Sequence, residues 1–498
     1  MAEVIENGST STAADEDYVV VSKDDLWKDA LVKEVGGATV QMLGLDDQAH
    51  HTAYARVSEG GENVNIGAVV ECMVDEGWRR VVKDIMEKKE HVEKDTHPAA
   101  SLLLRLGSVW LLNETAWQKG EGSHAHRVTP DEEMTVPDWQ NFTLRVHYVP
   151  DRFFVAETVD WSKPCRGLLV GPSTIVKIGE ETPHVPVLEG LPDTKDGVIV
   201  YEDAAHGFSI VNKPGAMPDH ATISNHAEDV VSCFRRALEE RKGTTSVHVA
   251  VQQRRDGCLD TATSGLLAIA TKAAFTTYMN KLLNKHQVTR HFKALVCVKD
   301  TGTLSKLEHF QSSGTIVTHY LDPKSPTPKH FYRHKPKDAK KEFLECKMRI
   351  VKIGDDKFRA ACVRSVYKDS VDSSLAHRLW GPDSATPAED LGVQYVMEVE
   401  VELLTARAQQ IHGQLAALGC PIVGDFQYGG GRCEFHSQHH KWNRLALQCC
   451  ELSFQEPQWK DKNHKKELVS SERKCFFRLN KGWWSEYLTQ YELYHQSY

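Results

Sequence analysis

Leu259-Asp-Thr-Ala-Thr-Ser-Gly265, followed by the apolar segment Leu266–Thr271, is the stretch that decides the fold. An aspartate followed by small hydroxylated residues and a glycine is typical of a carboxylate held on a tight loop beside a strand. Threonine and serine hydroxyls can orient such a carboxylate through short hydrogen bonds. Taken alone, the stretch favours the plainer interpretation, in which Asp260 only caps a turn.

Two other stretches frame this loop along the chain. Asn212-Lys-Pro-Gly215 ends a predicted strand over 208–213, where Pro-Gly is normally just a turn. Later, Thr405-Ala-Arg-Ala-Gln-Gln-Ile-His412 places Arg407 at a junction between a strand and a helix. It is followed by Gly419-Cys-Pro-Ile-Val-Gly-Asp425 and by Tyr428-Gly429. By itself, Arg407 is equally compatible with a surface salt bridge.

Together and in this order, the three stretches resemble the RluA-type pseudouridine synthases of the RsuA/RluA superfamily. The resemblance covers about residues 197–455, and the Pro-Ile-Val-Gly-Asp-x-x-Tyr-Gly pattern is its most specific part. Segments 314–323 and 445–450 resemble the eukaryotic, plant-type branch. The resemblance implies an α+β fold with a mixed, mainly antiparallel central sheet, flanked by helices and loops and preceded by a small α+β N-terminal domain.

The resemblance also implies roles for individual residues. Asp260 matches the family's nucleophile, which attacks either the ribose or the uracil ring, and Arg407 matches an arginine that pairs with it. An adjacent fixed cation keeps such a carboxylate charged, and the target uridine must leave its stack to be reached. The residues expected to bind substrate are Phe292, which would stack on the base, Arg290, Lys213, Thr263, Ser264, Gln410 and Ile411. The family uses no metal or organic cofactor, and we expect none here.

This sequence departs from the family pattern around the expected site. Cys258 replaces an arginine two residues before the aspartate, and Phe292 replaces a tyrosine. Arg290 stands where a lysine is common. Ala406, Ala408, Gln409 and His412 replace glycine, threonine, histidine and arginine. Two interpretations therefore stay open, because such changes around a reactive group can cost orders of magnitude in rate: an active synthase, or a family member that binds RNA with little catalysis.

Changes in composition and in the hydrophobic pattern along the chain predict its division into domains. Residues 1–24 are acidic and expected to be disordered, and 25–154 form an α+β region. Within it, 76–150 are either a small RNA-binding module or a generic fold, with a helix at Trp78–Lys89. Residues 155–195 are expected to be a linker, 196–460 the catalytic domain with a basic insertion at 300–345, and 461–498 a tail. The Lys/His-rich stretch at 324–341 is either a solvated loop or one that faces RNA.

Charge and composition limit the partners. The net charge of the 498 residues is −9, but residues 1–200 hold 19 Lys and Arg against 35 Asp and Glu, whereas 201–498 hold 41 against 34. Only the second part would attract a polyanion such as RNA. Twelve cysteines are too sparse for a disulfide framework. A zinc site from Cys433, His436, His439 and Cys449 is a weaker alternative. We expect a monomeric cytoplasmic or nuclear protein without a membrane segment.

Overall fold

The computed structural model divides into two compact units. One comprises Met1–Arg152 with Ala221–Asp229, and the other Phe153–His220 with Val230–Tyr498. The structure describes residues 31–43, 52–59, 63–74, 99–113, 125–129, 132–139, 141–147, 152–165, 175–177, 197–243, 247–251, 258–337, 342–359, 395–429, 445–462 and 465–485. The expected disorder of residues 1–24 and the helix at Trp78–Lys89 lie outside these ranges.

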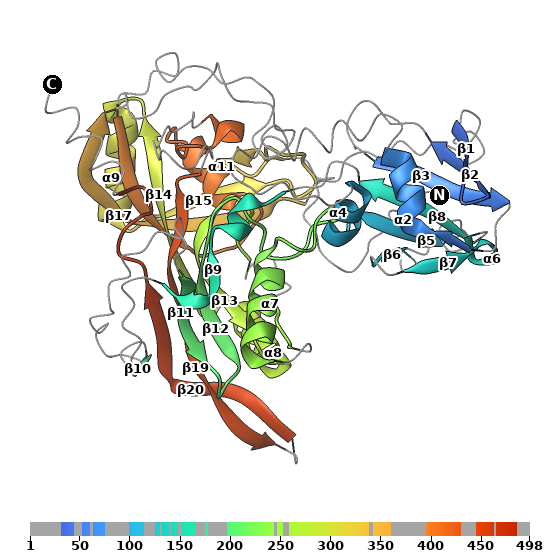
Figure 1. Ribbon diagram of the computed structural model, residues 1–498. Helices are drawn as coiled ribbons and strands as arrows, with labels where there is room; N and C mark the ends of the chain where they lie inside the picture. Colours follow the sequence, from blue (N-terminus) through green and yellow to red (C-terminus); the bar gives the residue numbers. More distant parts are fainter. Residues whose placement is uncertain are drawn as a thin grey trace, which may run out of the picture. The chain divides into compact units, whose positions relative to one another are not determined.

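The first unit contains an antiparallel sheet with helices beside it (Figure 1). In spatial order its strands are β1 (Leu31–Val35), β2 (Ala38–Leu43), β3 (Thr52–Glu59), β8 (Phe142–His147), β5 (Val109–Asn113) and β6 (Ala125–Arg127). The other elements are the paired strands β4 (Asn63–Asn65) and β7 (Glu133–Thr135), and the helices α2 (Ile66–Met73), α4 (Ala99–Leu106) and α6 (Val136–Trp139). Its core is aliphatic, with Val40, Ala55, Val69, Leu103 and Leu144 buried together.

The second unit is built on one large, mainly antiparallel sheet, which confirms the fold class predicted from the sequence. In spatial order its strands are β16 (Phe331–Tyr332), β15 (Ile316–Leu321), β17 (Leu344–Arg359), β18 (Tyr395–Leu403), β14 (Val288–Val298), β19 (Leu447–Lys462), β13 (Ser264–Ala270), β12 (Phe208–Lys213), β11 (Gly197–Asp203) and β9 (Asp160–Pro164). Strand β20 (Lys465–Arg478) pairs with β19 and with β10 (Ile175–Lys177). The pairs β9–β11 and β13–β19 are parallel.

Helices cover this sheet and bury its central strands. They are α7 (Val230–Lys242), α8 (Ala273–Asn284), α9 (Thr301–Ser313) and α11 (Gln410–Ala417). Every residue of β13 is buried, as expected of a central strand covered on both faces. Phe208 of β12 stacks on Phe275 of α8 with ring centroids 4.5 Å apart. A rigid, packed sheet therefore lies directly behind the Asp260 loop.

Gly265 is the residue of that loop whose identity is set by packing. It lies opposite Cys449 in the parallel pairing of β13 with β19. Its φ of +109° disfavours any side chain, and an added Cβ would lie 2.2 Å from the Cys449 carbonyl oxygen. The glycine at the end of the Thr-Ser-Gly pattern is therefore required by the close approach of two backbones.

The observed boundaries differ from the expected domains in three places. The expected linker at 155–195 contributes β9 and β10 to the large sheet, and the expected tail contributes β20. Residues Ala221–Asp229 belong to the first unit although they lie between β12 and α7. Arg152 holds this segment through an ion pair with Glu228, with Nη2 and Oε1 2.8 Å apart. The pairing of β9, β10 and β20 depends on backbone hydrogen bonds to strands distant in the chain. Runs of charge and the Pro/Gly content of a segment do not reveal these bonds.

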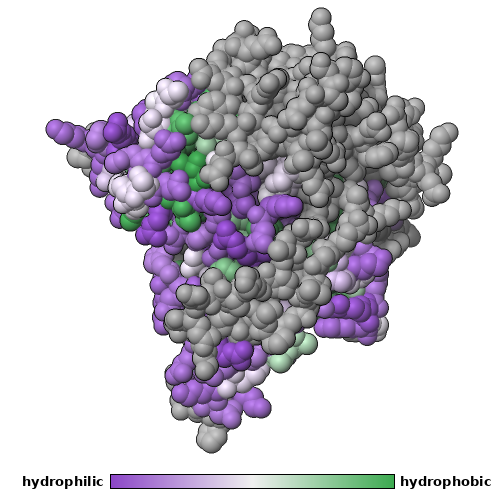
Figure 2. Space-filling model, turned by 90° about the vertical axis from the view of Figure 1, so that its left-hand side faces the viewer, coloured by the Kyte–Doolittle hydropathy of each residue, from purple (hydrophilic) through white to green (hydrophobic). Residues whose placement is uncertain are grey.

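The expected insertion at 300–345 is part of the fold. It contains α9, β15 and β16, and β15 pairs with β17 along its length. On the face shown in Figure 2, hydrophilic residues cover most of the described surface and apolar areas are small. Among the described residues, no helix is both long and apolar enough to cross a membrane.

Candidate functional site

The Asp260 loop is held by backbone hydrogen bonds on both sides of the aspartate. The amide of Leu259 donates to Asp219 Oδ2 at 2.7 Å, and the amide of Thr263 donates to Asp260 Oδ1 at 2.7 Å. The Met217 amide donates to the Thr261 carbonyl at 2.9 Å, which ties the loop to the segment after β12. The Asp260 side chain nevertheless keeps 42% of its surface exposed, so a substrate can reach it.

Lys213 lies beneath this loop and does not face solvent. Its side chain is fully buried, and Nζ donates to the carbonyl oxygens of Met217 at 2.5 Å, Pro214 at 3.3 Å and Thr261 at 3.3 Å. Burial lowers the pKa of the Lys213 ammonium, while the charges of Asp219 and Asp260 oppose that shift. The expectation that Lys213 binds substrate therefore needs correction: in this structure it joins two loops.

Replacing Lys213 with methionine tests this positioning role. Methionine keeps the apolar length but leaves three carbonyl oxygens without their buried donor and Asp219 without its nearby positive charge. We expect the free energy of unfolding to fall by about 3 kcal/mol, the usual scale for breaking one partner of a buried charge network. Chemical denaturation measures the loss, and the exposed Lys299→Met is the matched control. Equal stability of the two variants would contradict the role.

His412 is the side chain that pairs with Asp260. Its Nε2 lies 3.0 Å from Asp260 Oδ2, and its Nδ1 lies 2.7 Å from Asp425 Oδ2. The imidazole thus bridges two carboxylates, one from the loop before β13 and one from the turn after α11. His412 and Asp425 are nearly buried, with side chains 10% and 6% exposed. With a carboxylate at each nitrogen, the ring is held in one orientation and favours the doubly protonated, cationic form.

The electrostatics of this triad keep Asp260 ionised. Burial alone would lower the pKa of His412, but the charges of Asp425 and Asp260 raise it to about 10. Desolvation would raise the pKa of Asp260, yet the His412 charge, the His412 hydrogen bond and Thr263 hold it well below its usual range. The site therefore presents an ionised carboxylate next to a fixed positive charge at neutral pH.

Arg407, the cation expected to pair with Asp260, does not do so. Its side chain is exposed, and the hydrogen bond described for it is a long one, 3.5 Å from Nη1 to the Ala406 carbonyl. Gln409, the residue just before α11, has a left-handed φ of +55° and turns the chain into the helix. Within the helix, His412 is the residue that contacts Asp260. The prediction of an Asp260–Arg407 contact is wrong because the turn of the chain before α11 could not be read from the sequence.

The other expected substrate-binding residues lie mostly in the core. Phe292 is 3% exposed, with the guanidinium of Arg290 5.9 Å from its ring centroid. Gln410 donates to the Lys347 carbonyl and to Gln414, so it anchors α11. Thr263, Ser264 and Ile411 are also buried. The structure thus brings Thr263 to Asp260 through its amide, whereas none of the remaining residues of this set forms a hydrogen bond or ion pair with Asp260 in the described part of the chain.

Sequence reasoning missed Asp425 and Asp219 as parts of the site. Asp425 lies in the Gly-Asp-x-x-Tyr-Gly pattern, and His412 lies at the helix start, where the family has arginine. His412 lies in α11, and the chain returns to it through a turn at Gly424, where φ is +85°. This turn brings the Asp425 side chain to His412. Asp219 has no sequence signal, since nothing in the sequence pairs it with the amide of Leu259.

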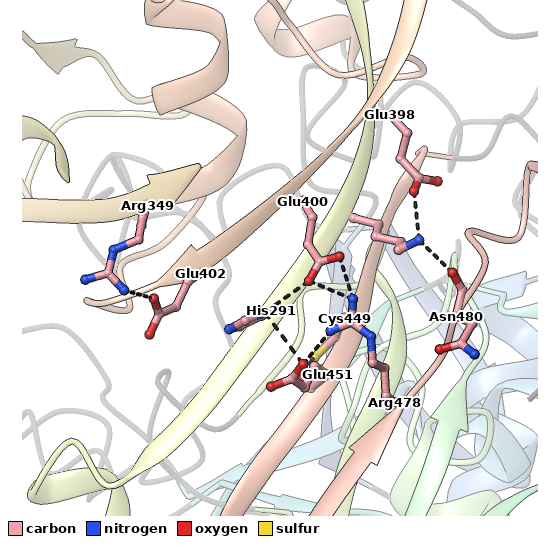
Figure 3. Close-up of polar contacts among 10 residues, drawn as sticks. His291, Arg349, Glu398, Glu400, Glu402, Cys449, Glu451, Arg478 and Asn480 are labelled. Atoms are coloured by element: carbon pink, nitrogen blue, oxygen red, sulfur yellow. Dashed lines mark hydrogen bonds and ion pairs between the residues drawn. The ribbon is translucent and has the colours of Figure 1, made fainter. Parts of the chain in front are cut away.

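A separate charged cluster is centred on His291 of β14 (Figure 3). His291 Nδ1 is 3.1 Å from Glu400 Oε1 and 3.7 Å from Glu451 Oε2. These three residues could supply metal ligands, but Arg478 already binds both carboxylates, at 2.7 Å to Glu400 and 2.5 Å to Glu451. The guanidinium neutralises the charge that would attract a cation, so the cluster is an ion-pair network. The residues of the alternative zinc site at 433–440 lie outside the described residues, and Cys449 is buried in β19.

An ionised, reachable carboxylate beside a fixed cation, on a loop at a mixed sheet, is typical of enzymes that use a carboxylate as nucleophile or base. Comparison with known proteins narrows this class. Residues 207–417 match the family model described as RNA pseudouridylate synthase. This stretch is thus similar to RNA pseudouridylate synthase domains, as the sequence resemblance predicted.

Two curated relatives are similar over about half of the chain. One is RNA pseudouridine synthase 6, chloroplastic, of Oryza sativa subsp. japonica, 25% identical over 237 residues, which are 47% of this chain and 40% of that protein. The other is RNA pseudouridine synthase 6, chloroplastic, of Arabidopsis thaliana, 24% identical over 47% of this chain and 41% of that protein. The chain thus spans about two fifths of the length of these relatives. Both names contradict the expected cytoplasmic or nuclear location and point instead to a plastid.

Two solved human structures are also similar. RNA Pseudouridylate Synthase Domain Containing 1 is 15% identical, with a TM-score of 0.30 over 60% of this chain and 95% of its own. RNA Pseudouridylate Synthase Domain Containing 4 is 16% identical, with a TM-score of 0.32 over 52% of this chain and 84% of its own. The likeness to the synthase family rests on the family model for residues 207–417 and not on these distant matches.

Proposed function

We propose that this protein is an RNA pseudouridine synthase that isomerises uridine in RNA, with Asp260 as nucleophile. The observation that carries the proposal is the Asp260–His412 contact of 3.0 Å within a domain that matches the synthase family. In this proposal His412, not Arg407, supplies the positive charge beside the nucleophile. The uridine must leave its stack for the carboxylate to reach it.

The chemistry needs no outside reagent. The bond from uracil N1 to ribose C1′ breaks, and a bond from uracil C5 to C1′ forms. The C5 proton is lost and N1 gains one, so the product is an isomer of the substrate. The ionised Asp260 bonds transiently to the ribose or to the uracil ring and is released unchanged. The His412 cation holds the carboxylate ready for this step without competing for its second oxygen.

The fixed pairing of Asp260 favours an active enzyme over a family member that only binds RNA. A synthase needs an ionised Asp260 beside a cation, whereas a protein that only binds RNA has no need of this pairing. Neither interpretation depends on Phe292, whose ring lies in the core. The RNA class and the modified position stay outside this proposal.

Pseudouridine mapping tests the proposal. RNA from the source cell, and RNA transcribed in vitro, are incubated with the full-length protein or with buffer alone. We expect new pseudouridine at one or a few positions in the treated RNA. The in vitro transcript carries no pseudouridine before treatment. If its pseudouridine content is the same with the protein as with buffer, the enzyme proposal is contradicted.

A further inference from the structure

The segment Pro323–Lys337, which we call the basic arm, connects β15 to β17 and is anchored on the helix that carries His412. The Phe331 ring packs against Gly413, where an added Cβ would lie 2.0 Å from the ring. The amide of Lys329 donates to the Tyr428 hydroxyl at 2.8 Å, and that hydroxyl donates to Gln409 at 2.8 Å. The arm is therefore fixed to α11 at Gly413 and, through Tyr428, to Gln409 just before the helix.

The charge of the basic arm is entirely positive. Between Pro323 and Lys337 the sequence has five Lys and Arg residues and no Asp or Glu. Lys324, Arg333, Lys335 and Lys337 are exposed, and no ion pair links them to the residues that the structure describes. Lys329 is used internally, since its Nζ donates to the Ser325 carbonyl at 2.7 Å. The exposed cations are thus available to an external anion.

Arg407 lies with these cations. Arg333 acts electrostatically on His319, and Arg407 acts on Cys346. His319 and Cys346 are directly opposite each other on β15 and β17. Arg407 also precedes Gln409, which accepts a hydrogen bond from the Tyr428 hydroxyl, and the same hydroxyl accepts from the Lys329 amide of the arm. Arg407 is exposed and adds a positive charge beside the arm.

We propose that Lys324, Arg333, Lys335, Lys337 and Arg407 form a docking surface for the phosphate backbone of RNA next to the target uridine. This inference rests on the proposed function, because it names the part of the chain that would hold that substrate. Exposed cations without carboxylate partners bind phosphate by releasing counterions, which gives affinity without sequence preference. The anchoring on α11 ties the bound backbone to the position of Asp260.

Measurement of RNA affinity at several salt concentrations tests the surface. The probe is a fluorescein-labelled RNA hairpin with uridines in its loop, and binding to the full-length protein is followed by anisotropy. The triple variant R333A/K335A/K337A should bind at least roughly tenfold more weakly. The slope of log K against log salt should fall by about 2, since each single-strand phosphate contact contributes about 0.7.

The matched control removes the same charge elsewhere. K299A/K460A/K466A replaces three exposed lysines, two of them on the β19–β20 hairpin that extends away from α11 (Figure 1). We expect its RNA affinity to stay within about twofold of wild type. Equal loss of affinity in both triple variants would overturn the docking surface, because only net charge would then matter. Unchanged affinity in R333A/K335A/K337A would overturn it as well.

Arg407→Ala separates the two roles considered for that residue. The docking surface predicts weaker RNA binding and a smaller salt slope. Unchanged binding together with loss of turnover would overturn the assignment of Arg407 to the surface. The binding assay does not depend on catalysis. If wild type makes no pseudouridine but the triple variant loses RNA binding, the proposed function fails and the docking surface stands. If wild type is active and the triple variant binds RNA normally, the docking surface fails and the proposed function stands.

Discussion

Replacing Asp260 with asparagine is expected to abolish pseudouridine formation, with a loss of at least ~10³-fold in turnover. The amide keeps the size of the carboxylate, and its oxygen can still accept from the Thr263 amide. It cannot act as the nucleophile, because the neutral amide has no anionic oxygen to form the bond. Losses of this size are usual when the nucleophile of an enzyme is removed.

The measurement is pseudouridine per RNA against time, under single-turnover conditions with enzyme in excess. Asp300→Asn is the matched control, since Asp300 is an exposed cap of α9 and asparagine caps equally well. Binding of the labelled RNA hairpin should be retained in both variants. Wild-type turnover in Asp260→Asn would exclude this residue as the nucleophile and would leave the family assignment intact.

Replacing His412 with alanine should give the second largest loss, about 10²-fold or more, whereas arginine at the same position should retain much of the turnover. Alanine leaves Asp260 and Asp425 without the cation between them. The pKa of Asp260 therefore rises, because its ionised form loses the stabilising positive charge. Arginine supplies a permanent charge to both carboxylates. Equal losses in His412→Ala and His412→Arg would show that the imidazole does more than provide charge.

Asp425→Asn tests the same triad through pH. The folded pKa of His412, about 10, lies above its ordinary value of 6.5. The stabilisation from its ion pairs is therefore complete below pH 6.5 and is lost as pH rises through 10. Removing the Asp425 charge lowers the pKa of His412, so both activity and stability should fall at a lower pH than in wild type.

The readouts for this shift are independent of each other. The imidazole titration of His412 is followed by NMR in the free protein, and turnover is measured across the same pH range. Uracil also loses a proton at alkaline pH, so turnover is compared between variants and not with pH alone. An unchanged titration in Asp425→Asn would contradict the positioning role. Asp425→Asn combined with His412→Arg should show no alkaline loss in this range, because arginine stays charged.

The sequence predicted the sheet and its major strands because hydrophobic runs and glycine positions are local signals. The expected strand at 208–213 and the apolar segment Leu266–Thr271 correspond to β12 and β13. Its failures came from long-range pairing. Strands β9, β10 and β20 lie in stretches expected to be linker or tail, and their backbone partners are distant in the chain.

The same distinction applies to the site. The sequence by itself determined that Asp260 sits on a tight loop of a pseudouridylate synthase domain, since Thr263, Ser264 and Gly265 form a local pattern. Only the tertiary structure decided which cation meets this carboxylate. Arg407 and His412 are five residues apart, and the left-handed turn at Gln409 with the α11 packing directs His412 inward and leaves Arg407 in solvent. Direction of a side chain depends on how the helix packs, and no spacing in the sequence encodes that.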